Sequence, residues 1–257
     1  MKILRHIFIL AVVATVLTVT NVAQARKVVM DGLVSYWSFD KGSVAGNTVT
    51  DDFGNNDGTT DGSVEAVDDG KVGGALKFSG GHVDCGADKS LTDISDQLTL
   101  EAWIKPEKAG WAILAGMSRS GGNTYVIAWS DQRRIDFNIW NGSLETWPLH
   151  SDAQPALNEW HHVAGVYDGS AATIYINGEA DKKKDFSGSL THNGENFWIG
   201  ARKSDGLPFH GLLDELRVYN RALSQEEVEM NMVAEGLTAV EPTAKLALTW
   251  GTIKVSR

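Results

Sequence analysis

Cysteine is almost absent from this sequence, since Cys85 is the only one among 257 residues. A single thiol cannot form an intramolecular disulfide, so the fold must be held together by its hydrophobic core. Cys85 stands in the stretch 81–86, where side chains alternate as they do in a strand. A catalytic cysteine needs a positioned base, and the neighbouring sequence offers none. We therefore predict a buried and inert thiol.

Long apolar runs are also lacking, apart from Ile7–Leu17 near the start. Lys2 and Arg5 precede this run, and Ala23-Gln24-Ala25 closes the segment. A basic head, a short apolar middle and an A-x-A end are typical of a secretory signal peptide. The run is shorter than the roughly 20 residues that span a bilayer, and an uncleaved anchor is the alternative. We predict a signal peptide over 1–25 and a mature protein that is secreted, periplasmic or at the cell surface.

Basic residues are fewer than acidic ones, with 23 Lys and Arg against 33 Asp and Glu. Removing Lys2 and Arg5 with the predicted signal lowers the net charge from −10 to −12. Nucleic acids and anionic membranes attract clustered Lys and Arg, so the balance argues against both as partners. No second long apolar segment follows, and we expect no membrane insertion after the signal is removed.

Helical periodicity is nearly missing before residue 223. Short runs of β-forming residues appear instead, separated by dipeptides such as Asn141-Gly142 and Asp168-Gly169, which favour hairpins because both residues tolerate positive φ. The predicted strands cover residues 33–39, 75–79, 98–105, 112–117, 124–129, 135–140, 161–167, 173–176, 196–200 and 212–219. Many short strands with regular turns predict an all-β fold, a two-sheet antiparallel jelly-roll sandwich, forming one domain over 26–236.

One short helix is signalled near the end of this domain. Residues 224–227 have the sequence SQEE, a capping box in which the Ser hydroxyl and the last Glu satisfy each other's backbone amides. We predict a helix from there to about Ala234, with Val228, Met230 and Met232 packed onto the sandwich.

We predict that residues 237–257 form a separate C-terminal tail. Pro242 interrupts any helix, and Leu246, Leu248 and Trp250 alternate with smaller or polar residues. This alternation is compatible with an added strand and with an unpaired apolar segment. The sequence leaves both readings open.

Several motifs occur in the order typical of one family of jelly-roll domains. They are LVSYWSFD at 33–40, GNNDG at 54–58, GALKF at 74–78, LTLEAWIK at 98–105, WHHVA at 160–164, YDG at 167–169, IYING at 174–178 and GLLDELRVYNRALS at 211–224. Over about residues 32 to 235 the chain resembles the laminin-G-like domains of the concanavalin A-like lectin/glucanase superfamily. The resemblance implies an exported, non-catalytic domain that binds glycans, other proteins or calcium. Many such domains carry a disulfide, which this chain cannot form.

Motifs for catalysis are missing. Retaining glycosidases of this superfamily hold two carboxyl groups about 5 Å apart on one strand face, in a Glu-x-Asp-x-(x)-Glu pattern that does not occur here. Asp214 and Glu215 are adjacent, so on a regular strand they point to opposite faces. His161 and His162 are adjacent too, and the remaining histidines lack the spacing of zinc ligands. We predict no enzymatic activity, with a glycoside hydrolase as the alternative if carboxylates converge in the fold.

The nine Trp suggest a binding surface in the middle of the chain. Alternation over residues 135–140 places Asp136, Asn138 and Trp140 on the face opposite the apolar side chains, and Trp147 follows across a predicted turn. An aromatic plane beside amide and carboxylate groups suits a sugar, which is apolar on its ring faces and polar at its hydroxyls. We predict these four residues as the binding site for a carbohydrate or a glycosylated surface. Protein adhesion, and a purely structural role of the rings at a sheet rim, are the alternatives.

Asp40 and Asp214 are the candidate calcium ligands. The resemblance implies that acidic residues of the first and last strands approach each other, and Ca²⁺ is bound by carboxylate and carbonyl oxygens. Asp214 is in register with Leu216 and Val218, so we place it on the core-facing side, where a carboxylate needs a metal or backbone donors. A structural calcium ion and local capping of backbone amides by Asp214 are both left open. No other cofactor is expected.

Overall fold

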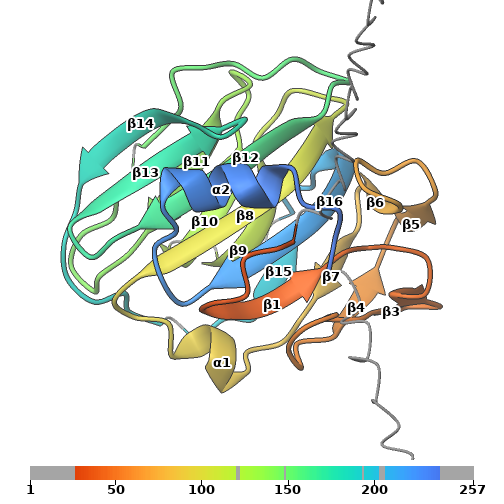
Figure 1. The fold of residues 1–257 in the computed structure, drawn as a ribbon, viewed down its shortest axis with the longest axis horizontal. Coiled ribbons are helices and arrows are strands. Elements are labelled where there is room, and N and C mark those ends of the chain that lie inside the picture. The colour runs from red at the N-terminus through yellow and green to blue at the C-terminus, as the bar shows by residue number, and fades with distance from the viewer. Residues whose placement is uncertain (1–26, 120–121, 148, 193, 203–205, 238–257) are drawn as a thin grey trace, which may run out of the picture.

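The computed structural model describes residues 27–119, 122–147, 149–192, 194–202 and 206–237. The predicted signal peptide lies outside these residues, as does the alternating part of the tail. Within them the chain forms sixteen strands and two short helices (Figure 1). In chain order they are β1 Leu33–Trp37, β2 Val44–Ala45, β3 Thr48–Val49, β4 Gly58–Asp61, β5 Val64–Val67, β6 Ala75–Ser79, β7 His82–Asp84, α1 Lys89–Thr92, β8 Leu98–Pro106, β9 Ala112–Arg119, β10 Gly122–Trp129, β11 Ile135–Ile139, β12 His161–Tyr167, β13 Ala171–Ile176, β14 Glu179–Asp185, β15 Phe197–Ile199, β16 His210–Tyr219 and α2 Gln225–Met232.

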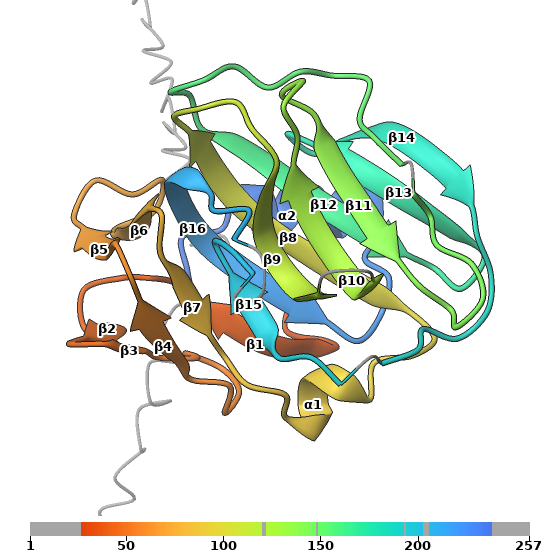
Figure 2. The same cartoon turned by 180° about the vertical axis from the view of Figure 1, so that it is seen from behind.

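The strands form two antiparallel sheets packed face to face, which confirms the predicted jelly-roll sandwich. Sheet A has the order β14-β13-β12-β8-β16-β6-β5, with β1 also paired to β16, and sheet B has the order β11-β10-β9-β15-β7-β4-β3-β2. Figures 1 and 2 show the two sheets from opposite sides. All ten predicted strands are present. The additional strands are short or polar, and apart from β7, which lies in the alternating stretch 81–86, they lack the apolar alternation that identifies a half-buried strand.

The main core fills the space between the sheets. Strand β11 contributes Ile135, Phe137 and Ile139, which are fully buried, as the alternation predicted. Trp37 of β1 stacks on Phe197 of β15 with ring centroids 5.3 Å apart, so the two sheets are joined by aromatic packing. Cys85 is 5% exposed within this core, and burial raises the pKa of its thiol well above the usual value. The predicted burial of the thiol is confirmed.

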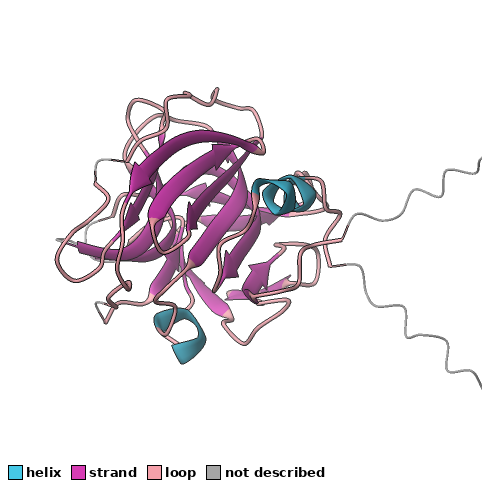
Figure 3. Cartoon of the chain, turned by 60° about the vertical axis from the view of Figure 1, so that its left-hand side comes forward, coloured by secondary structure: helices cyan, strands magenta, loops and turns pink. Residues whose placement is uncertain are grey.

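Helix α2 covers the outer face of sheet A, and both helices lie outside the two sheets (Figure 3). The predicted capping box is present, with Ser224 and Glu227 satisfying each other's backbone amides. Val228 is buried as predicted, but Met230 is 52% exposed, so its predicted packing is wrong. Asn231 is buried in its place, because the side chains three apart on this two-turn helix share the face against the sheet. No helix in the described part of the chain is long and apolar enough to cross a membrane.

Strand β14 forms one edge of sheet A and was not predicted. It has the sequence EADKKKD, with three consecutive lysines at 182–184. Charged side chains on an edge strand hinder pairing with another chain. The strand was not predicted because few of its side chains are buried, so its sequence shows no alternation of apolar and polar residues.

Candidate functional site

A cavity of about 450 Å³ lies on the outer face of sheet B, which faces the viewer in Figure 2. Strands β9, β10 and β11 form its base, and the segments around Trp111, Glu145 and Leu207 form its sides. The lining residues are Trp111, Ile113, Asn123, Val126, Ala128, Asn138, Glu145, Trp147, Arg202 and Leu207. Sheet B therefore uses one face for the core and the other for an open, mixed polar and apolar surface.

The base of the cavity is apolar. Ile113 of β9 and Val126 and Ala128 of β10 form a small cluster, against which Leu207 packs. These strands turn the intervening side chains into the main core, because successive residues of a strand point to opposite faces. An apolar base suits the C–H face of a sugar ring.

Two tryptophan rings stand at the side of the cavity. Trp111 is 39% exposed and Trp147 is 46% exposed, with ring centroids 5.4 Å apart and planes inclined by 48°. The His150 ring meets Trp147 edge-on, with a centroid separation of 5.0 Å, and lies 6.4 Å from Trp111. This contact fixes the orientation of the Trp147 ring while leaving nearly half of the residue open to solvent.

Two polar side chains of β11 lie on the cavity side of the sheet. Asp136 is fully buried and pairs with His150 Nδ1 through Oδ1, and Asn138 is 4% exposed. Asp136 Oδ2 and Asn138 Oδ1 are buried and have no hydrogen-bond partner. Burial raises the pKa of Asp136 to about 6, although the hydrogen bond from His150 opposes the rise. Unpartnered buried acceptors are costly, and Asn138, the one of the two that lines the cavity, can accept a hydrogen bond from a ligand.

A chain of hydrogen bonds crosses the polar side of the cavity. Arg202 donates to Ser118 Oγ over 3.2 Å, Ser118 donates to Asn123 Oδ1 over 2.5 Å, and Asn123 Nδ2 donates to Glu145 Oε1 over 2.9 Å. Among the described residues that line the cavity, Glu145 is the single carboxylate. A two-carboxylate glycosidase mechanism needs a second one facing it.

The structure places two of the four predicted binding residues, Asn138 and Trp147, in the lining of the cavity. Asp136 is fully buried on the same face of β11 as Asn138, Trp140 is half-buried, and neither of them lines the cavity. Trp140 lies one residue beyond the end of β11 at Ile139, the strand whose alternation the prediction used. Trp140 instead forms an isolated bridge with Glu145.

The ring that packs beside Trp147 is that of Trp111. It lies just before β9, 36 residues from Trp147 in the sequence. No local pattern links the two rings. Only the pairing of β9 with β10 and of β10 with β11 places them side by side.

Asp40 and Asp214 both reach one turn, the segment 71–74 that leads into β6. Asp214 Oδ2 accepts hydrogen bonds from the amides of Lys71 and Val72, each over 2.8 Å, and Asp40 Oδ1 accepts from Gly74 over 2.7 Å. The two ends of the domain therefore meet at this turn. Amide capping by Asp214, one of the two roles left open by the sequence, is present in the structure.

The predicted side of Asp214 is wrong. The register between β16 and β8 shifts between Asp214 and Arg217, and Glu215 has a left-handed φ of 54°. This bulge adds one residue, so Leu213 and Leu216 both enter the main core. Asp214 points to the 71–74 turn instead of sharing a side with Leu216.

One atom at this turn, Asp214 Oδ1, favours the binding of a cation. Asp214 is fully buried and its Oδ1 has no partner, and burial raises the pKa of its carboxyl group to about 8. A cation would satisfy that oxygen and favour the ionised carboxylate. In the described part of the chain no group of three or more His, Cys, Asp or Glu side chains is arranged around a common metal position. A calcium ion at this turn would be held by Asp214 and Asp40.

A second set of buried charges lies under α2, on the other side of the sandwich. Arg217 of β16 pairs with Glu215 and, over 3.3 Å, with Glu101 of β8. Asn231 of α2 donates to Glu101 over 2.7 Å, and Tyr36 donates to Glu215 over 2.5 Å. Burial raises the pKa of Glu101 to about 7, against the opposing charge of Arg217. This network is closed to solvent and fastens the helix to sheet A.

The chain belongs to the family described as the Concanavalin A-like lectin/glucanases superfamily, a laminin-G family, whose model matches residues 78–229. No curated protein sequence matches the chain. Similar solved structures include domain 4 of AbnA, an extracellular arabinanase from Geobacillus stearothermophilus, in complex with arabinotriose. That domain is 23% identical, with a TM-score of 0.62, over 78% of this chain and 98% of the other.

Two further similar structures come from longer proteins. The binding domain of Paraclostridial Mosquitocidal Protein 1 is 18% identical, with a TM-score of 0.62, over 79% of this chain and 52% of that one. Trypanosoma rangeli sialidase is 17% identical, with a TM-score of 0.60, over 80% of this chain and 33% of that one. The chain thus spans about half of the toxin domain and a third of the sialidase. At these identities the likeness establishes the fold.

Proposed function

We propose that the protein is an exported, non-catalytic binding protein that holds a carbohydrate chain in the cavity of sheet B. The observation that carries the proposal is the exposed pair Trp111 and Trp147 beside two buried acceptors that lack partners. The rings supply flat apolar surfaces for sugar C–H groups, and Asn138, which lines the cavity, accepts a hydrogen bond from a hydroxyl group through Oδ1. The predicted signal segment supports export.

The similar structures support this choice of ligand class. Domain 4 of the arabinanase was solved with arabinotriose, and the toxin domain is described as a binding domain. Protein adhesion through the same surface and glycoside hydrolysis remain the competing functions. Adhesion is disfavoured by the concave shape of the cavity and by its polar lining residues Asn123 and Asn138, and hydrolysis by the single carboxylate among the described residues that line it.

Trp147→Ala is expected to weaken glycan binding about thirtyfold, or roughly 2 kcal/mol, as for a typical hot-spot ring. The ring is nearly half exposed, so the melting temperature should change little. Isothermal titration calorimetry with arabinotriose, or with the best ligand from a glycan array, measures the affinity of both proteins. A parallel scan of the array separates a poor choice of sugar from a lack of glycan binding.

Trp140→Ala is the matched control, because Trp140 is close in sequence but does not line the cavity. It should retain the affinity of the wild-type protein. If no glycan on the array binds, or if Trp147→Ala binds as tightly as the wild type, the cavity is not a carbohydrate site. Cleavage of a bound oligosaccharide during the titration would favour the hydrolase.

We further propose a structural calcium ion at Asp40 and Asp214. The unpartnered Asp214 Oδ1 supports this site, as does the meeting of both carboxylates at the 71–74 turn. Such an ion would stabilise the junction of the two chain ends that lacks a disulfide.

Adding a chelator is then expected to lower the melting temperature, because a ligand that binds only the folded state stabilises it. Asp214→Asn should abolish most of that shift while keeping an oxygen to accept from the Lys71 and Val72 amides. Asp214→Ala should be destabilised in addition. Equal chelator shifts in the wild type and in Asp214→Asn, measured by differential scanning calorimetry, would remove Asp214 from the site.

A further inference from the structure

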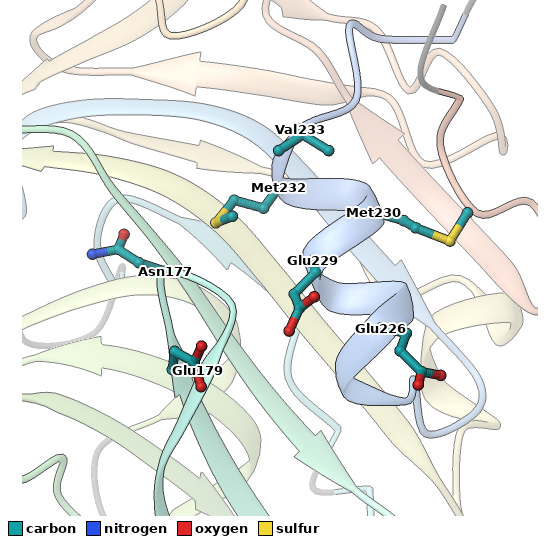
Figure 4. Close-up of a pocket in the computed structure, with 7 residues that line it drawn as sticks. All are labelled: Asn177, Glu179, Glu226, Glu229, Met230, Met232 and Val233. Carbon is teal, nitrogen blue, oxygen red and sulfur yellow. The ribbon is translucent and has the colours of Figure 1, made fainter. Parts of the chain in front are cut away.

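A second concave surface, the α2 groove, lies far from the cavity, between α2 and the turn that joins β13 to β14. It encloses about 520 Å³ and is lined by Met230, Met232 and Val233, three glutamates and Asn177. Figure 4 shows Met232 and Glu229 pointing from α2 toward the Asn177 turn, with Met230 on the other side of the helix. Met230 is 52% exposed and Val233 is 36% exposed. The groove therefore presents apolar side chains to solvent.

The charge of the α2 groove is one-sided. Glu179, Glu226 and Glu229 are all exposed, and no Lys or Arg is among the residues that line the groove. Gln225 contacts Glu179 over 3.3 Å and Glu229 over 3.0 Å, but it brings no positive charge. The last turn of α2 carries no basic residue either. This excess of negative charge favours a cationic occupant.

The segment that follows the helix has the complementary composition. Residues 238–257 contain Lys245, Lys254 and Arg257 against one acid, Glu241. Leu246, Leu248 and Trp250 alternate directly after Lys245, a spacing that puts side chains on one side wherever a segment is extended. The charge of Lys245 is complementary to the three glutamates of the groove. The apolar residues that follow it are complementary to the exposed methionines.

The segment 238–257 is attached close enough to the α2 groove to contact it. Leu237, the last described residue, packs with the cluster under α2. Lys245 follows it by eight positions, and an extended segment of that length spans up to roughly 26 Å. A helix of eight residues is about 12 Å long, so Lys245 can reach every part of the groove. Tethering also gives an effective concentration on the order of millimolar, which allows weak contacts to be occupied.

We propose that residues 238–257 dock in the α2 groove of their own molecule, with Lys245 beside the glutamates and the Leu246–Trp250 stripe over Met230, Met232 and Val233. Docking removes exposed methionine surface from water and neutralises part of the acidic rim. This surface is separate from the cavity of sheet B, and the inference does not depend on the proposed carbohydrate binding.

Methyl NMR of the full chain, with the methionine methyl groups labelled by ¹³C, tests the proposal. The mature chain contains four methionines, two in the groove and Met30 and Met117 elsewhere. A docked Trp250 ring shifts neighbouring methyl signals through its ring current, so Trp250→Ala should move the Met230 and Met232 signals. The signal of Met117, which is buried in the main core, should stay in place. The double variant Glu226→Gln, Glu229→Gln should move the groove signals in the same direction.

Two control variants separate docking from general perturbation. Trp111→Ala removes an exposed ring at the cavity, and Glu65→Gln neutralises an exposed acid on β5. Neither should move the Met230 or Met232 signals. The proposal is overturned if Trp250→Ala leaves both signals unchanged. It is also overturned if the shift disappears on dilution, because the occupant would then be the tail of a second copy.

Discussion

Replacing Arg217 by methionine is expected to lower the free energy of unfolding by about 3–5 kcal/mol. The Arg217 guanidinium is fully buried, pairs with Glu215 and Glu101, and lies 4.9 Å from the centre of the Tyr36 ring. Its removal leaves two buried carboxylates without the cation that compensates their desolvation. Methionine keeps much of the volume, so the loss reports the charge more than a cavity.

Lys77→Met provides the matched control for a basic residue in an ion pair on sheet A. Lys77 and Glu107 pair over 3.2 Å, but both side chains are about one-third exposed. A solvent-exposed pair contributes about 0–1 kcal/mol, so this variant should remain near the wild type. Urea denaturation of the three proteins gives the comparison. A loss below about 1 kcal/mol in Arg217→Met would show that Glu101 and Glu215 relax without their partner.

The stability of the metal-free protein is expected to fall as the pH rises from about 4 to about 8. Burial raises the pKa of Asp214 from 3.8 to about 8 and that of Glu101 from 4.5 to about 7. Over this window the folded protein holds protons that the unfolded chain releases, so raising the pH favours unfolding. The change in pKa of Asp214 alone corresponds to at most roughly 6 kcal/mol.

Thermal unfolding in the presence of a chelator, recorded at several pH values, measures this slope. Asp214→Asn should flatten most of it, because the amide does not ionise. Added calcium should also flatten it in the wild type if the ion binds the Asp214 carboxylate, since the ionised form is then favoured. A wild-type stability that rises steadily from pH 4 to pH 8 in chelator would contradict the assignment.

The outer faces of the two sheets have different roles, one in stability and the other in the proposed binding. The outer face of sheet A is closed by α2 and by the Arg217 network, and its ionisable groups govern stability. The outer face of sheet B keeps two tryptophans exposed and two acceptors unpartnered, and it carries the proposed binding function. Variants on one side are therefore expected to leave the property of the other side unchanged.

Local patterns in the sequence were sufficient for those parts of the candidate site that lie within one strand. Asp136 and Asn138 face away from the core because side chains alternate along β11. The same rule failed for Trp140, where the strand stops, and for Asp214, where a bulge changes the phase. A bulge or a strand end depends on the partner strand, and the chain on either side of the break gives no sign of it.

The sequence by itself determined the sandwich, its ten apolar strands, the capped helix, the buried thiol and the family. Each depends on contacts between residues close in the chain or on a simple alternation of apolar and polar side chains. Only the tertiary structure decided that Trp111 joins Trp147, that Asp40 and Asp214 meet at one turn, and that Arg217 lies between Glu215 and Glu101. The physical reason is that these groups approach through strand register and crossover, which bring together residues up to 174 positions apart, as in Asp40 and Asp214.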